Sequence, residues 1–213
     1  MKCDKQYMRL YAVTDRAWVG KQTLYEQVEA ALKGGVTCVQ LREKELSEED
    51  FLAEAKEIKA LCSRYHVPFF INDNVDVAIK CQADGVHVGQ EDMKASDVRS
   101  KVGDQMIIGV SAHSVEEAVE AVKNGADCLG VGAMFTTSTK ADASVLPKET
   151  LRAICEAVDV PVVAIGGIGE SNILELAGTG ADGVALVSAI FGAADIEAQC
   201  RKLRALSEEM VSR

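Results

Sequence analysis

Two cations and an amide leave one apolar strand on the same side. Residues 40–44 (QLREK) follow the β-branched, apolar stretch 36–39, which is typical of a strand buried on both faces. Side chains alternate along a strand with a period of two, so Gln40, Arg42 and Lys44 point the same way. In a chain with a formal net charge of −10, this cluster indicates an anionic ligand held locally. The alternative is that both cations are solvated and pair with neighbouring glutamates.

Carboxylates and amides follow two other predicted strands, in residues 72–74 (NDN) and 89–92 (GQED). Such residues commonly form turns that cap the next helix. Two neighbouring loops with carboxylate and amide oxygens could instead hold Mg²⁺, which prefers oxygen ligands and keeps several waters. Facing Arg42 and Lys44, these oxygens would accompany a diphosphate.

Glycine-rich or short-helix segments follow the last two predicted strands, in residues 166–169 (GGIG) and 188–192 (SAIFG). Glycines let backbone N–H groups approach a phosphate, and a short helix adds its positive N-terminal end. The alternative is that Gly167 serves only the turn. We favour a phosphate site, so one pocket would have two phosphate anchors and would take two phosphorylated substrates or one bisphosphate.

The loop over residues 132–146 is far longer than the usual two to six residues. It carries four hydroxyls and a lysine in a row at 136–140 (TTSTK). A disordered connector would explain the polarity, whereas a lid that closes over a phosphorylated substrate explains both polarity and length. We favour the lid.

Four similar stretches divide the chain. Ala-Asp pairs open apolar strands at Asp84, Asp127 and Asp182, and Thr37 holds the equivalent place in a degenerate copy. The intervals are 47 residues (37 to 84), 43 (84 to 127) and 55 (127 to 182), about what a βαβα unit needs. Four such units alternate strand and helix strictly, which is compatible with an open doubly wound sheet or a closed barrel. The fourfold similarity favours an α/β fold with a single (β/α)8 TIM barrel over residues 1–213.

The remaining elements follow from apolar periodicity and capping residues. The predicted strands cover residues 8–13, 36–40, 68–71, 85–88, 106–110, 128–131, 160–165 and 183–187. The predicted helices cover 23–33, a segment from 47, 75–80, 97–101, a segment from 114, 148–158, 171–178 and 194–213. In such barrels active sites lie on the loops after the strands, where all the segments above fall. Ser111, after the strand 106–110, joins them.

Composition narrows the class of protein. Hydrophobic residues make up 48% and aromatic residues 5% of the chain, as in parallel sheets packed by helices. The acidic balance and the lack of a basic stripe argue against binding nucleic acid or an anionic membrane. Seven scattered cysteines without a CxxC pair favour free thiols over a zinc or redox site. With no apolar segment typical of a secretory signal or membrane span, we expect a cytoplasmic protein.

Seven segments together, in order and across almost the whole chain, resemble the thiamine phosphate synthase family. They are 10–15 (LYAVTD), 40–44 (QLREK), 72–73 (ND), 85–92 (GVHVGQED), 109–113 (GVSAH), 137–140 (TSTK) and 166–168 (GGI). The resemblance implies one barrel that joins hydroxymethylpyrimidine diphosphate to hydroxyethylthiazole phosphate. The products would be thiamine phosphate and diphosphate, formed by a dissociative reaction through a pyrimidine carbocation.

The resemblance also implies roles for individual residues. The pyrimidine diphosphate would be held by Gln40, Leu41, Arg42, Glu43, Lys44, Asn72, Ser111 and Lys140. Mg²⁺ would be bound by Asp73 and Asp92. The thiazole phosphate would contact Thr137, Ser138, Thr139, Gly167, Val187 and Ser188. We expect Arg42, Lys44, Lys140 and Ser111 to be catalytic, the three cations by stabilising the departing charge.

Two other functions are weighed against this one. A thiazole tautomerase of the same fold would share the glycine-rich phosphate site but would need no Mg²⁺ or diphosphate clamp. A non-catalytic barrel that binds phosphorylated metabolites would not need leaving-group activation. The cations and carboxylates argue against both, whereas His87 and His113 are expected to be structural. The sequence leaves open whether the chain is a monomer or a homo-oligomer.

Overall fold

The computed structural model describes residues 3–20, 22–137 and 144–213. In this part of the chain, eight parallel strands close into one barrel, in which each strand pairs with the next and β8 pairs with β1. The predicted barrel is confirmed. The strands are β1 (Leu10–Val13), β2 (Cys38–Leu41), β3 (Phe69–Asn72), β4 (Gly85–Val88), β5 (Ile107–Ala112), β6 (Cys128–Val131), β7 (Val162–Ile165) and β8 (Gly183–Leu186).

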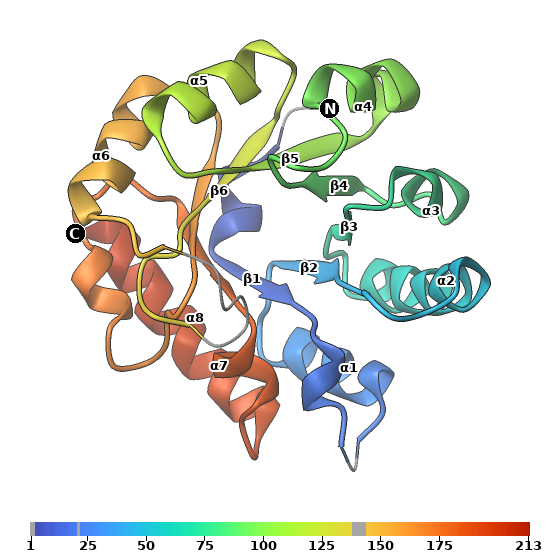
Figure 1. The fold of residues 1–213 in the computed structure, drawn as a ribbon. Coiled ribbons are helices and arrows are strands. Elements are labelled where there is room, and N and C mark those ends of the chain that lie inside the picture. The colour runs from blue at the N-terminus through green and yellow to red at the C-terminus, as the bar shows by residue number, and fades with distance from the viewer. Residues whose placement is uncertain (1–2, 21, 138–143) are drawn as a thin grey trace.

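Helices surround the strands on the outside of the barrel (Figure 1). The α-helices are α1 (Leu24–Lys33), α2 (Glu48–Arg64), α3 (Val75–Lys80), α4 (Ala95–Val102), α5 (Val115–Lys123), α6 (Lys148–Ala157), α7 (Ser188–Phe191) and α8 (Ile196–Ser212). The 3-10 turns are η1 (Lys5–Met8), η2 (Arg16–Trp18), η3 (Gly103–Gln105) and η4 (Ile173–Leu176).

Two differences between the predicted and the observed elements bear on the site. The helix expected over 171–178 is only the 3-10 turn η4. Just before it, the Asn172 side chain accepts a hydrogen bond from the Gly169 amide and donates one to the Gly167 carbonyl, which holds this segment in a turn. Strand β5 runs on to Ala112, so Ser111 lies within a strand and not in the loop after it.

Two apolar clusters hold the barrel together. The inner cluster fills the barrel and includes Tyr11, Phe70 and Ile107, with Cys38 and Cys128 as small buried members. The larger cluster lies between the strands and the surrounding helices. The aliphatic core expected from composition is therefore split by the wall of the barrel.

The fourfold repeat has a common structural role at the N-terminal end of the barrel. Each repeated side chain lies just before an even-numbered strand and accepts a hydrogen bond from a backbone amide at the start of the preceding odd-numbered strand. The pairs are Thr37 with Leu10 (2.8 Å), Asp84 with Phe69 (2.8 Å), Asp127 with Ile108 (2.9 Å) and Asp182 with Val162 (3.0 Å). We refer to these four contacts as the strand clasps.

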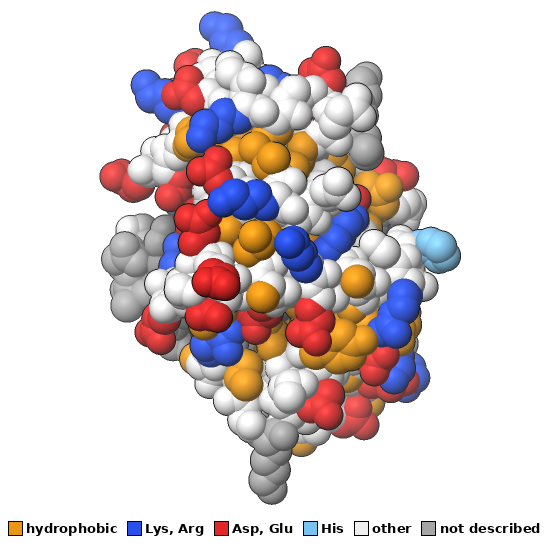
Figure 2. Space-filling model, turned by 90° about the vertical axis from the view of Figure 1, so that its right-hand side faces the viewer, with side chains coloured by type: hydrophobic (Ala, Val, Ile, Leu, Met, Phe, Trp, Pro, Cys, Tyr) orange, Lys and Arg blue, Asp and Glu red, His pale blue; other side chains and the backbone are white. Residues whose placement is uncertain are grey.

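The surface carries both signs of charge. On the side where α2 and α3 lie, Figure 2 shows acidic and basic side chains interspersed with apolar ones. Ion pairs join neighbouring helices there, including Lys80 with Glu48 (2.5 Å) and Lys101 with Asp76 (3.5 Å). Among the described residues, none of the helices combines the length and apolarity that a membrane crossing requires.

Candidate active site

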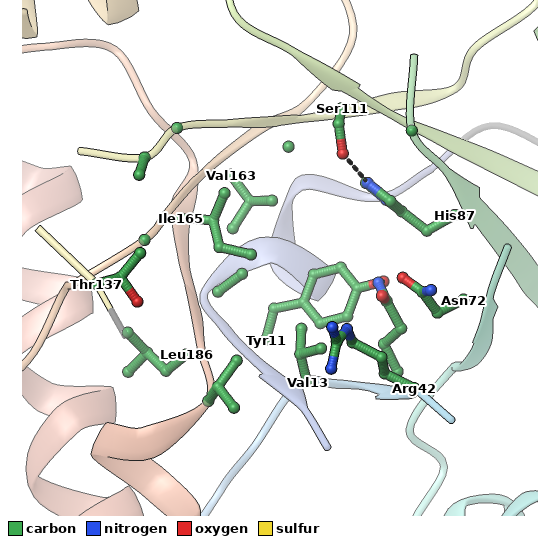
Figure 3. Close-up of a pocket in the computed structure, with 18 of the residues that line it drawn as sticks. Tyr11, Val13, Arg42, Asn72, His87, Ser111, Thr137, Val163, Ile165 and Leu186 are labelled. Carbon is green, nitrogen blue, oxygen red and sulfur yellow. Dashed lines mark hydrogen bonds between the residues drawn. The ribbon is translucent and has the colours of Figure 1, made fainter. Parts of the chain in front are cut away.

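A pocket of about 610 Å³ opens at the C-terminal ends of the strands. Side chains of the barrel interior, including Tyr11 and Val163, form its floor, and the loops after the strands form its walls (Figure 3). The structure brings together most of the residues expected from the sequence. Those that line the pocket are Gln40, Arg42, Lys44, Asn72, Asp73, Asp92, Ser111, Thr137, Gly167, Val187 and Ser188.

The end of β2 supplies the cationic side of the pocket. Arg42 projects into the pocket on the side of Val13 (Figure 3), and its Nη1 lies 3.4 Å from Asp15 Oδ2. Lys44 Nζ lies 2.6 Å from Asp73 Oδ2. Both cations therefore pair with aspartates from neighbouring loops, and both line the pocket.

Leu41 and Glu43 alternate with these residues and point the other way. Leu41 is fully buried in the cluster between strands and helices. The Glu43 carboxylate accepts two hydrogen bonds from the Arg16 guanidinium, at 2.9 and 3.0 Å, and its side chain is only 2% exposed. The structure does not bring these two side chains to the pocket: alternation along β2 turns Leu41 outward, and the ion pair with Arg16 holds Glu43 away. Their expected part in holding the pyrimidine diphosphate stays a prediction.

Two carboxylates converge beside Lys44. Asp73 has a left-handed backbone (φ 62°) and donates its amide to the His87 carbonyl at 2.8 Å. Asp92 accepts a hydrogen bond from the Gly89 amide at 2.8 Å. Partial burial raises the pKa of Asp92, and the neighbouring Asp73 carboxylate raises it further. Among the described residues there is no group of three or more His, Cys, Asp or Glu side chains that could hold a metal, so the protein offers a pair of carboxylates.

The opposite wall is built on two glycines after β7. Gly166 and Gly167 have φ values of 95° and 65°, which side chains other than glycine rarely adopt. A Cβ on Gly167 would also stand 2.5 Å from the Thr136 carbonyl oxygen. The first part of the long loop therefore packs directly on this turn. Helix α7 begins at Ser188 on the same wall, as the predicted short helix requires.

Three predicted site residues, Ser138, Thr139 and Lys140, lie outside the described residues. Their contacts with substrate and the closure of the lid stay predictions. Thr137, the last described residue before them, lines the pocket on the side of Ile165 and Leu186 (Figure 3).

Comparison with known proteins identifies the family. A family model described as thiamine monophosphate synthase matches residues 10–190. The chain is 50% identical to the thiamine-phosphate synthase of Ruminiclostridium cellulolyticum over 194 residues, covering 91% of this chain and 92% of that one. It is 47% identical to the thiamine-phosphate synthase of Chloroflexus aurantiacus, covering 93% and 92%. The chain belongs to the thiamine monophosphate synthase family.

A solved structure agrees with this membership. The thiamine phosphate pyrophosphorylase of Pyrococcus furiosus superimposes with a TM-score of 0.90 at 41% identity, covering 97% of this chain and 98% of that one. These relatives are named as thiamine-phosphate synthases, which are transferases, so the chain is an enzyme by membership. The resemblance of its motifs to that family is confirmed.

The pocket of this family member also contains polar side chains that were not expected to act in it. The Tyr11 hydroxyl accepts a hydrogen bond from Gln40 Nε2 at 2.9 Å, and burial raises the pKa of Tyr11 well above its usual value. His87 lies on the pocket wall with its Nε2 3.0 Å from Ser111 Oγ (Figure 3). Both were readable as inward positions from strand alternation, but nothing local gives their partners. His113, exposed at the rim, pairs with Glu117 at 3.0 Å.

Proposed function

We propose that this chain is a thiamine-phosphate synthase that joins hydroxymethylpyrimidine diphosphate to hydroxyethylthiazole phosphate with the help of Mg²⁺. The observation that carries the proposal is the division of one pocket into two walls. One wall holds Arg42, Lys44 and a pair of carboxylates, whereas the other is a glycine turn beside the start of α7. Such a pocket suits a diphosphate on one side and a monophosphate on the other.

The carboxylate pair fits Mg²⁺. This ion commonly binds proteins through one or two carboxylates and completes its octahedron with waters and substrate phosphates. Asp73 and Asp92 would hold it, since both line the pocket and lie close enough for Asp73 to raise the pKa of Asp92. When bound, Mg²⁺ would stabilise negative charge on the diphosphate oxygens.

The chemistry that this chain must assist is departure of the leaving group. The thiazole nitrogen already carries a lone pair, so its attack requires no general base. The C–O bond to diphosphate breaks, diphosphate leaves with the electron pair, and a C–N bond forms to the thiazole nitrogen. Arg42 and Lys44 are placed to stabilise the charge that develops on diphosphate, and Lys140 is proposed to join them. The glycine wall would bind the thiazole phosphate so that its nitrogen meets the reacting carbon.

The test is the release of diphosphate from the pyrimidine diphosphate, measured with and without thiazole phosphate and Mg²⁺. If diphosphate is released only when the pyrimidine diphosphate, thiazole phosphate and Mg²⁺ are all present, and thiamine phosphate is formed, the result supports the synthase. Isomerisation of the thiazole phosphate without diphosphate release would make the chain a tautomerase, and binding without turnover would make it a sensor.

Lys140→Ala should lower kcat more than it raises the KM for thiazole phosphate, because developing charge exists only in the transition state. The opposite pattern would make Lys140 a simple binding residue.

A further inference from the structure

The imidazole of His87 lies in a slot made by two glycines of neighbouring strands. Gly109, paired with His87 in the β4–β5 register, would place a Cβ only 2.5 Å from His87 Nδ1. A Cβ on Gly130 of β6 would stand 3.1 Å from His87 Cε1. Glycine inside a strand weakens the strand and often marks a close approach by another group. Both glycines therefore make room for this ring.

The slot lies directly under Ser111. His87 Nε2 is 3.0 Å from Ser111 Oγ, and Figure 3 shows the ring directed at that hydroxyl. The side chain of Gln90 donates a hydrogen bond to the Ser111 carbonyl at 2.6 Å. Two residues of the β4 segment thus hold Ser111, one through its hydroxyl and one through its backbone.

The other ring nitrogen decides where the proton sits. His87 Nδ1 is buried and has no hydrogen-bond partner among the described residues. A neutral imidazole carries a single N–H, on one of its two ring nitrogens. Buried N–H groups are almost never left unpaired, whereas unpaired acceptors are tolerated more often. The proton therefore belongs on Nε2, and Nδ1 keeps a bare lone pair.

We propose that His87 is a positioning residue, which donates its Nε2–H to Ser111 Oγ and so directs the Ser111 hydroxyl proton into the pocket. Once Oγ accepts from the ring, the serine proton is free to donate to an acceptor on the substrate. The identity of this acceptor rests on the proposed function: it is an oxygen or nitrogen atom of the pyrimidine diphosphate. The slot between Gly109 and Gly130 keeps the ring where its Nε2 is within hydrogen-bond distance of Ser111 Oγ.

A thermodynamic cycle tests the proposal through activity. Ser111→Ala should lower kcat/KM for the pyrimidine diphosphate by about 10- to 100-fold, the usual worth of a hydrogen bond to a charged group. His87→Phe, which keeps a ring but has no donor, should cost about as much. The double variant should be no worse than Ser111→Ala alone, because both changes remove one interaction. His87→Gln, whose amide nitrogen can replace Nε2, should recover most of the activity. The KM for thiazole phosphate should stay unchanged in all four.

Two glycine variants are graded controls for the slot. Gly109→Ala should impair the enzyme like His87→Phe, because its Cβ would displace Nδ1, whereas Gly130→Ala should cost less, because its Cβ is merely tight. Additive losses for His87→Phe and Ser111→Ala, or a His87→Gln variant as poor as His87→Phe, would overturn the proposal.

A measurement of the ring itself needs no turnover and no substitution at His87 or Ser111. Nitrogen-15 NMR of labelled histidine should show the proton of His87 on Nε2, with signals of the other histidines assigned through His66→Gln and His113→Gln. A proton on Nδ1 would overturn the proposal directly. If the chain failed to form thiamine phosphate, the proposed function would fall, while the tautomer would still decide whether His87 donates to Ser111.

Discussion

The ion pair between Arg16 and the buried Glu43 carboxylate predicts that Glu43→Gln reduces stability and not substrate binding. The Glu43 carboxylate accepts two hydrogen bonds from Arg16, and its side chain is 2% exposed. Breaking a well-buried ion pair costs about 3–5 kcal/mol. Arg16 is itself 39% exposed and keeps Glu54 as a partner at 2.8 Å, and glutamine still offers one acceptor. We therefore expect a loss of about 1–2 kcal/mol in the free energy of unfolding, below the fully buried value.

Urea and thermal unfolding measure this change. For a chain of this size, a loss of about 1–2 kcal/mol lowers the Tm by about 2–8 °C. The matched control is Glu208→Gln, which breaks an exposed pair with Arg204 within α8 and should change stability by less than about 0.5 kcal/mol. At 25 °C the kcat/KM of Glu43→Gln should stay within about threefold of the unsubstituted enzyme, a change of under about 1 kcal/mol.

The opposite result would refute the reasoning. If Glu43→Gln unfolds with the unsubstituted chain but its KM for the pyrimidine diphosphate rises tenfold or more, Glu43 contacts substrate. The ion pair with Arg16 would then be a minor contact of the free enzyme.

Three further predictions concern the glycine wall, the carboxylate pair and the thiols. Gly167→Ala should lower the free energy of unfolding by at least about 1–2 kcal/mol, the usual cost of a left-handed backbone, and raise the KM for thiazole phosphate. The control is Gly169→Ala, whose Cβ would lie 3.9 Å from the Ala189 Cβ. Equal effects of the two substitutions would contradict the role of the turn. Asp92→Asn should raise the Mg²⁺ concentration for half-maximal turnover by about tenfold or more while thiazole phosphate binding is retained; unchanged Mg²⁺ dependence would remove Asp92 from the metal site. Burial raises the pKa of Cys62 and Cys200 to about 12, so about one thiol in 10⁴ is ionised at pH 8. Alkylation, located by peptide mass spectrometry, should be negligible at pH 8 until urea unfolds the chain, and it should become faster as the pH rises toward 12. Rapid labelling of the folded chain at pH 8 would show that these sites open.

The barrel could be predicted because its signals are local and repeated. Short β-branched runs, capping residues such as Ser47 and Ser114, and the recurring Ala-Asp pairs can each be recognised within a few residues. Both serines do accept hydrogen bonds at the starts of α2 and α5. The α-helix expected over 171–178 does not form, because the Asn172 side chain makes hydrogen bonds with the glycine turn after β7. Helix periodicity carries no information about these hydrogen bonds.

The sequence predicted which residues belong to the candidate site better than it predicted where their side chains point. Family motifs name Leu41 and Glu43 beside Arg42, although neither side chain lines the pocket. The role of His87 depends on Gly109 and Gly130, which lie on two other strands, and no window of sequence around His87 contains that information. The glycines in the middle of those strands were the available signal, since strands rarely contain them without a reason.

The strand clasps have a consequence for how the chain could be cut and rejoined. Each clasp joins residues only 15 to 27 positions apart, and both partners belong to the same strand–helix–strand quarter. Each quarter can therefore form its clasp, at the N-terminal end of its strands, before the barrel closes, since short loops close at low entropic cost. New termini placed between quarters would leave all four clasps within continuous chain. Termini placed inside a quarter would instead turn one clasp into a contact between distant ends of the polypeptide, so circular permutation should be tolerated at the junctions of quarters and resisted within them.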